Sequence, residues 1–251
     1  MTVFRLDVPA RSGKPRRVGL THVLDKGMPA AQAAELLRSY ARYVDVWKFG
    51  WGTAYLDEEL PAKAVVLADY DVLSCLGGTL LEVAWTQGKA DDLLAWAADK
   101  GVACIEVSRG AAPMTLDDKH KLIDAAARRF TVLSEVGSKS VTSTMTAADW
   151  ATEVAADLDA GATWVLAEGR ESGTVGIYHD DGVPRQDVVD AIVAVGGADR
   201  IVFEAPRKDQ QVWFIQRFGA DVNLANIAPG EVLGLETLRL GLRADTMARG
   251  S

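Results

Sequence analysis

Apolar runs that end abruptly in charged residues are the most informative feature of this sequence. Three of these runs lead into Glu135, Glu168 and Glu204. Side chains at the ends of several buried strands converge only when those strands are parallel neighbours. Three carboxylates at one level suit a hard divalent cation such as Mg²⁺, with water or substrate oxygen completing the shell. We therefore predict that Glu135, Glu168 and Glu204 bind Mg²⁺.

Cations follow the same runs and indicate a small, highly anionic substrate. Arginine binds phosphate or carboxylate through two parallel hydrogen bonds, whereas lysine acts as a point charge. The predicted substrate-binding residues stand near the ends of the runs: Arg170, Arg207, Lys208, Gly77, Gly78 and Asn226, with Arg239 and Arg243 in support. An alternative is that each glutamate pairs with a neighbouring cation, such as Arg170 or Lys208, and that no metal binds.

Eight strand-like runs, most of them followed by a helix-like stretch, predict the fold. We place strands at 18–24, 44–49, 71–76, 103–107, 131–136, 164–167, 201–204 and 221–224. Eight alternating units favour an α/β fold, a single (β/α)8 TIM barrel, over the runner-up, a doubly wound open sheet. The sequence contains neither a G-x-G-x-x-G nor a P-loop motif. We divide it into an N-terminal arm (1–18), a catalytic barrel (19–246) and a C-terminal tail (247–251).

One helix is clear from its spacing. Residues 146–161 begin with a threonine that can cap a helix and end with a glycine, and Trp150, Val154 and Leu158 form an apolar stripe. Asp149, Glu153 and Asp157 share an adjacent face, which we interpret as solvated. The basic run 11–17 is interpreted in the same way, as a solvated arm.

Composition excludes several classes of partner. The formal net charge of −8 argues against nonspecific binding to nucleic acid or to an anionic membrane. The sequence shows neither a transmembrane-length apolar stretch nor a signal peptide. Cys75 and Cys104 lie in apolar runs and are expected to be buried reduced thiols of a cytoplasmic protein. The sequence leaves open whether the chain forms a homo-oligomer.

A series of motifs resembles the phosphosulfolactate synthase family of coenzyme M biosynthesis. The motifs are Gly19-Leu-Thr-His-Val-Leu-Asp-Lys-Gly27, Lys48-Phe-Gly-Trp-Gly-Thr53, Gly77-Gly-Thr79, Glu135-Val-Gly137, Glu168-Gly-Arg-Glu-Ser-Gly173, Phe203-Glu-Ala-Pro206, Gln210-Gln211, Val222-Asn-Leu-Ala-Asn-Ile227, Leu235-Glu-Thr-Leu-Arg239 and Gly241-Leu-Arg243. The resemblance spans residues 19–246. It implies a Mg²⁺-dependent barrel that adds sulfite to phosphoenolpyruvate, giving 2-phospho-3-sulfolactate. The family's proton donor, a lysine after Glu-Val-Gly, maps to Lys139, and we expect Lys139, Lys48 and Asp25 to be catalytic.

The chain departs from the family pattern at a few positions. Leu76 stands where a proline is common, Arg109 where an acidic or amide residue is frequent, and Ser138 where a second lysine can occur. Two alternatives therefore stay open. One is a relative that uses phosphoenolpyruvate with a different nucleophile, and the other is a non-catalytic, stress-associated relative.

Overall fold

The computed structural model, which describes residues 4–137 and 145–247, is a closed barrel of eight parallel strands paired in chain order. The strands are β1 (Thr21–Asp25), β2 (Val46–Phe49), β3 (Leu73–Leu76), β4 (Cys104–Val107), β5 (Thr131–Val136), β6 (Trp164–Ala167), β7 (Ile201–Glu204) and β8 (Leu224–Ile227). This confirms the predicted (β/α)8 fold. The last strand begins three residues later than we predicted.

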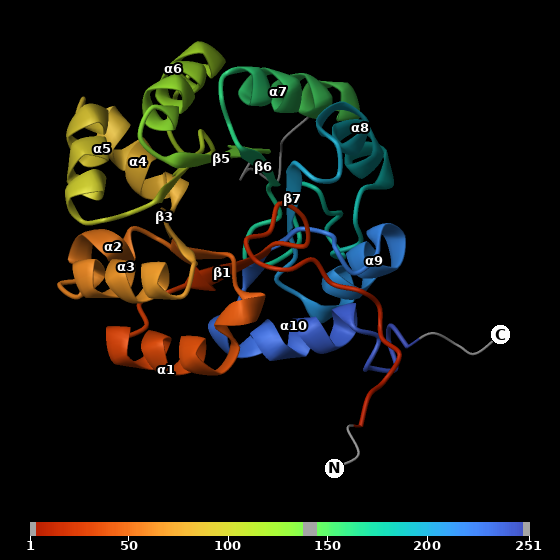
Figure 1. The fold of residues 1–251 in the computed structure, drawn as a ribbon. Coiled ribbons are helices and arrows are strands. Elements are labelled where there is room, and N and C mark those ends of the chain that lie inside the picture. The colour runs from red at the N-terminus through yellow and green to blue at the C-terminus, as the bar shows by residue number, and fades with distance from the viewer. Residues whose placement is uncertain (1–3, 138–144, 248–251) are drawn as a thin grey trace.

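Helices surround the barrel as a ring (Figure 1). They are α1 (Ala30–Tyr40), α2 (Thr53–Leu56), α3 (Leu60–Asp69), α4 (Gly78–Thr86), α5 (Ala90–Asp99), α6 (Leu116–Ala127), α7 (Ala147–Asp159), α8 (Gln186–Gly196), α9 (Lys208–Phe218) and α10 (Val232–Arg239), with 3-10 turns η1 (Ala41–Tyr43) and η2 (Pro229–Glu231). In α7, Thr146 accepts a hydrogen bond from the Asp149 amide, as its predicted capping role requires.

Alternation along each strand builds two separate cores. Outward residues such as Val23, Trp47 and Phe203 pack against the helices in one large cluster. Inward residues form a second cluster along the barrel axis: Leu20, Val46, Cys75, Cys104, Leu133, Leu166, Val202 and Ala225. Both cysteines are free and buried, as expected. This inner cluster fills the barrel up to the C-terminal ends of the strands, so the interior is a packed core. Space for a substrate is therefore expected at the C-terminal ends of the strands.

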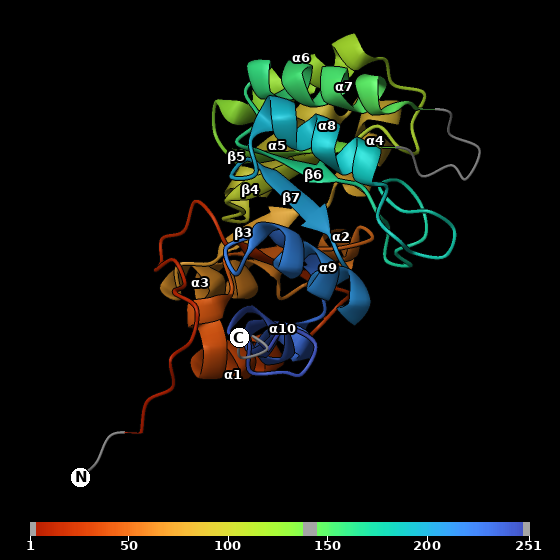
Figure 2. The ribbon, with the colours of Figure 1, turned by 90° about the vertical axis from the view of Figure 1, so that its right-hand side faces the viewer.

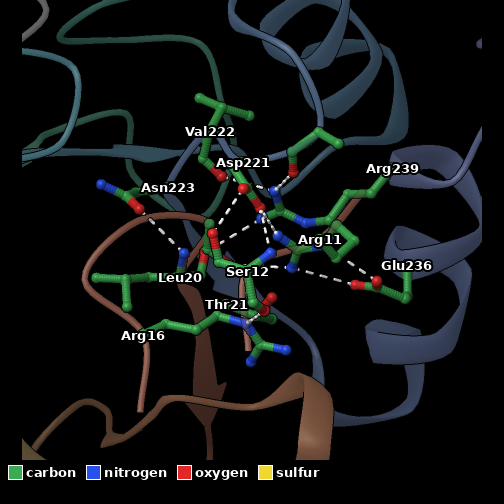
Figure 3. A network of polar contacts seen from close by, with 12 residues as sticks. Arg11, Ser12, Arg16, Leu20, Thr21, Asp221, Val222, Asn223, Glu236 and Arg239 are labelled. Atoms are coloured by element: carbon green, nitrogen blue, oxygen red, sulfur yellow. Dashed lines mark hydrogen bonds and ion pairs between the residues drawn. The ribbon is translucent and has the colours of Figure 1, made fainter. Parts of the chain in front are cut away.

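The basic run near the N-terminus is not solvated, contrary to our interpretation. Arg11 forms ion pairs with Asp221 and Glu236 (the latter at 3.0 Å), and Arg16 pairs with Asp45 at 3.0 Å. Figure 3 shows the contacts of Arg11 beside the starts of the first and last strands, and Figure 2 shows the segment on the side opposite the loop that follows β6. The segment therefore closes the N-terminal end of the barrel.

The acidic face of α7 is also not solvated as predicted. Glu153 and Asp157 are buried, and the buried Lys119 of α6 lies 2.9 Å from Glu153 and 2.6 Å from Asp157. Lys119 also donates to the backbone oxygen of Glu135, at 2.7 Å. Only Asp149 stays exposed, at the helix cap. This ion cluster supports the end of β5 from behind.

Candidate active site

A cavity of about 250 Å³ opens at the C-terminal ends of the strands. Its lining comprises Leu24, Lys48, Gly50, Trp51, Gly77, Gly78, Thr79, Glu106, Glu135, Glu168, Arg170, Glu171, Glu204 and Asn226. A larger cavity of about 940 Å³ lies at the other end, beneath the N-terminal segment. We place the site in the smaller cavity because all three predicted carboxylates, Lys48 and Arg170 line it, and because barrel enzymes use this end.

Lys48 is the buried cation of this site. Its Nζ atom lies 2.8 Å from Glu106 Oε2 and 3.7 Å from Glu204 Oε1. Burial by itself would lower the pKa of Lys48, but the carboxylates of Glu106, Glu204 and Glu135 together raise that pKa above its ordinary value. Lys48 is therefore a permanent positive charge near neutral pH.

The two carboxylates beside Lys48 differ in electrostatic environment. Burial acts to raise the pKa of Glu106. The positive charge of Lys48, together with hydrogen bonds from Lys48 and from the Gly78 amide (2.8 Å), outweighs burial, and the pKa of Glu106 is lowered overall. Burial raises the pKa of Glu204, and the attraction of the more distant Lys48 does not offset this effect. Glu204 also accepts a hydrogen bond from the Gly169 amide at 2.9 Å. Glu106 thus has the stronger preference for the ionised state.

The predicted metal set is present but does not converge on one point. Glu135, Glu168 and Glu204 line the same cavity, and Glu168 Oε1 accepts a hydrogen bond from the Arg170 amide at 2.8 Å. Within residues 4–137 and 145–247, however, no three His, Cys, Asp or Glu side chains are close enough to bind a metal ion together. Their oxygen chemistry suits Mg²⁺, which commonly uses one or two carboxylates and keeps several waters.

The predicted cations separate into two groups. Arg170 lines the cavity. Arg207 instead pairs with Asp209 at 2.6 Å, and Lys208 pairs with Asp245 at 2.9 Å, and neither lines the cavity. Arg207 also donates to the Asp181 backbone oxygen at 3.4 Å, which ties the loop after β6 to α9. The structure therefore does not bring Arg207 and Lys208 into the site.

Arg239 and Arg243 are misplaced in our prediction. The buried Arg239 donates to the backbone oxygens of Ala220 and Val222, both at 2.6 Å, and of Leu20 at 3.1 Å. These carbonyls precede β8 and β1, so Arg239 lies at the N-terminal end of the barrel, where Figure 3 shows it beside Val222 and Leu20. Arg243 lies 3.9 Å from Asp245 and does not line the cavity.

Asp25 is buried beneath the loop after β1. It accepts hydrogen bonds from the amides of Gly27 (2.8 Å) and Met28 (2.6 Å) and from the Trp47 indole (3.0 Å), and Lys63 lies 3.4 Å away. This arrangement orients the loop, and Asp25 does not line the cavity of Lys48. Asp25 lines the adjoining cavity instead, and its catalytic role stays a prediction.

Asn226 and the two glycines lie where we predicted them, in the cavity wall. The Asn226 backbone has a positive φ of 60°, and its buried side-chain oxygen accepts no hydrogen bond from the described parts of the chain. The Asn226 amide lies 3.5 Å from Nδ1 of His22. Burial, with Lys48 nearby, lowers the pKa of His22 to about 3, so this imidazole is neutral.

Comparisons with known proteins identify the family. Residues 9–245 match the family described as (2R)-phospho-3-sulfolactate synthase (ComA). The phosphosulfolactate synthase of Methanothermobacter thermautotrophicus is 42% identical over 255 residues, covering 99% of each chain. That of Bacillus subtilis is 40% identical over 249 residues, covering 98% of this chain and 99% of the relative. This chain belongs to the phosphosulfolactate synthase family.

Structural likeness supports only the fold. A crystal structure of 3-hexulose-6-phosphate synthase superimposes with a TM-score of 0.53 and 19% identity, covering 91% of this chain and 95% of the other. In the described residues, no helix has the length and apolarity needed to cross a membrane. The resemblance that the motifs suggested is confirmed at the level of the family, and the chain is an enzyme of that family.

Lys139, the predicted proton donor of this phosphosulfolactate synthase family member, lies outside the described residues, which stop at Gly137 and resume at Met145. The sequence places Glu106 at the end of a strand but gave it no role in the predicted site, although it contacts Lys48 directly. The available signal was its place on a strand, two residues after Cys104, because alternation then turns both side chains inward. Trp51 and Glu171 also line the cavity, and neither had been given a role, although Glu171 follows the same strand as Glu168.

Proposed function

We propose that this chain adds sulfite to C3 of phosphoenolpyruvate and requires Mg²⁺. The observation that carries the proposal is the cavity in which Lys48 is buried among carboxylates from several strands, in a chain of this family. A carbon–sulfur bond forms as the sulfur lone pair attacks C3. The C2–C3 π electrons move towards C2 and its carboxylate, and a proton delivered to C2 completes 2-phospho-3-sulfolactate.

The charge of the cavity supports a role for a metal ion. Among the described residues, the lining has five carboxylates, those of Glu106, Glu135, Glu168, Glu171 and Glu204, and two cations, Lys48 and Arg170. A substrate that carries a phosphate and a carboxylate needs further positive charge at a site with this described lining. We propose that Glu135, Glu168 and Glu204 hold Mg²⁺, in part through water. The bound ion would offset charge that develops on the substrate carboxylate.

The protein residues have distinct proposed roles. Lys48 supplies fixed positive charge at the floor of the cavity and, because its pKa is raised, is a poor proton donor. Arg170 binds phosphate or carboxylate at the mouth. We propose Lys139 as the acid that protonates C2, on the strength of the motif that precedes it. Two free buried cysteines agree with the reducing cytoplasm as the site of action.

The test is direct. Purified enzyme is incubated with phosphoenolpyruvate, sulfite and Mg²⁺, and phosphorus-31 NMR follows conversion of the enol phosphate to an alkyl phosphate ester. We expect conversion that requires all three components and stops with excess chelator. Full activity in chelator would contradict the metal proposal. Failure with sulfite, but turnover with another nucleophile, would contradict the choice of sulfite alone.

A further inference from the structure

Three loops meet at the mouth of the cavity. Lys26 follows β1, Trp51 follows β2 and Glu171 follows β6. The Lys26 Nζ atom lies 3.7 Å from Glu171 Oε2 and 4.5 Å from the centroid of the Trp51 ring. Because β1 and β6 are not neighbours in the closed barrel, the Lys26–Glu171 pair reaches across the opening.

The contact is one that a ligand can displace easily. The side chains of Lys26 and Glu171 are 48% and 49% exposed, and an exposed ion pair of this kind contributes little to stability. Lysine carries its charge on a flexible four-carbon stem, so its Nζ atom can move while the stem stays in place. The Trp51 ring beneath the ammonium keeps that charge at the mouth.

Trp51 holds an unusual backbone conformation for this purpose. Its φ is 54°, in the left-handed region that a bulky residue seldom adopts, and the residue is 59% exposed. An exposed tryptophan gains little from burial that would offset this conformation. Backbone strain of this type concentrates at ligand-binding sites.

Positive charge is also scarce in the described lining of the cavity. Lys48 is already shared by Glu106 and Glu204, and Arg170 is the other cation in the part of the lining that the structure describes. Lys26 stands next to Glu171, and Glu171 lines both this cavity and the adjoining one that Lys26 lines. A phosphate dianion in the cleft would attract Lys26 more strongly than the single charge of a half-exposed glutamate does.

We propose that Lys26 is a substrate-binding residue that exchanges Glu171 for the phosphate of the substrate. Glu171 holds Lys26 at the mouth of the cavity and competes with the substrate phosphate for the Lys26 ammonium. The proposal rests on the proposed function for the identity of that substrate, phosphoenolpyruvate, but its chemistry requires only a phosphate group.

Variants of the two partners give a test with opposite signs. Lys26→Met should weaken phosphoenolpyruvate binding, measured by titration calorimetry, and raise KM by roughly 10- to 100-fold, the usual effect of losing a charged hydrogen bond. Lys26→Arg should keep most of the affinity. Glu171→Gln removes the competitor and should tighten binding by about 2- to 5-fold, since an exposed pair of this kind is weak.

A matched control is Lys121→Met in the exposed Lys121–Asp117 pair of α6, at 2.6 Å, which should change neither Kd nor KM. If Lys26→Met and Glu171→Gln weaken binding alike, the pair is a structural latch and the proposal is wrong. An unchanged Kd in Lys26→Met also overturns it.

Inorganic phosphate, titrated in parallel, separates this proposal from the proposed function. If wild type fails to convert phosphoenolpyruvate but binds phosphate more tightly than Lys26→Met does, the reaction is wrong and the role of Lys26 stands. If wild type binds neither ligand, both are overturned. Melting temperatures close to wild type would confirm that the variants are folded.

Discussion

The Nζ atom of Lys48 lies 2.8 Å from Glu106 Oε2, and both side chains are buried at the rim of the barrel core. Glu204 shares the same ammonium at the longer distance of 3.7 Å. This unequal sharing explains why the pKa of Glu106 is lowered, while burial keeps that of Glu204 raised. The two glutamates are therefore expected to contribute to stability with opposite signs at neutral pH.

Glu204→Gln should stabilise the fold while reducing activity. Because its pKa is raised by folding, Glu204 destabilises the folded state when it is ionised. This cost is absent below the pKa of the unfolded chain, near 4.5, and grows as pH rises through the folded pKa. The amide can still accept from the Gly169 amide. A gain of ~1 kcal/mol would raise Tm by about 2–4 °C in a chain of this size. Calorimetric scans between pH 4 and 8 should show the gain growing with pH.

Glu106→Gln should have the opposite effect. Breaking a buried ion pair typically costs about 3–5 kcal/mol, so Tm should fall at neutral pH. Because the pKa of Glu106 is lowered, its contribution is present above the unfolded value and is lost as pH falls through the folded pKa. The loss of Tm should therefore shrink in acid. Equal shifts of Tm in the two variants would show that Lys48 does not discriminate between the carboxylates.

Arg170→Ala should raise KM for phosphoenolpyruvate or lower kcat/KM. Loss of one charged hydrogen-bond partner costs about 1.5–3 kcal/mol, or roughly 10- to 150-fold. Lys208→Ala is the matched comparison, since its partner is Asp245 and it does not line the cavity. Steady-state kinetics should show a change in the first variant only. A similar change in Lys208→Ala would place that lysine near the substrate after all.

Arg239→Met should destabilise the protein without changing KM. Three backbone carbonyls lose their donor at the closed end of the barrel, with an expected cost of about 3 kcal/mol. That corresponds to a fall in Tm of about 6–12 °C. Activity below the transition should match wild type per folded molecule. A raised KM in the folded variant would mean that the two ends of the barrel are coupled.

Lys139→Ala should fold normally, bind phosphoenolpyruvate and lose about 10²–10⁴ in kcat, the usual contribution of a positioned general acid. Lys139→Arg should recover little, since a guanidinium does not release its proton near neutral pH. Single-turnover kinetics would measure the chemical step. If the arginine variant works nearly as well as wild type, Lys139 provides charge and the proton has another source.

The sequence by itself determined the barrel and most of the cavity. Glu135, Glu168 and Glu204 were found because a buried strand leaves a recognisable apolar run, and because parallel strands deliver their ends to one face. Lys48, Arg170 and Asn226 followed from the same local rule. Strand 8 was placed too early because Asn223 and Asn226 interrupt its apolar pattern.

Only the tertiary structure decided which charges are paired, and with what. The spacing of Glu153 and Asp157 predicts a solvated helix face, yet both are buried and pair with Lys119 of another helix. Arg239 is the last residue of a family motif, yet its partners are carbonyls from distant segments. Helical and strand periodicity report which side of an element is apolar. The partner of a charged side chain depends on which elements the closed barrel brings within a few ångströms, and that distance is not encoded locally.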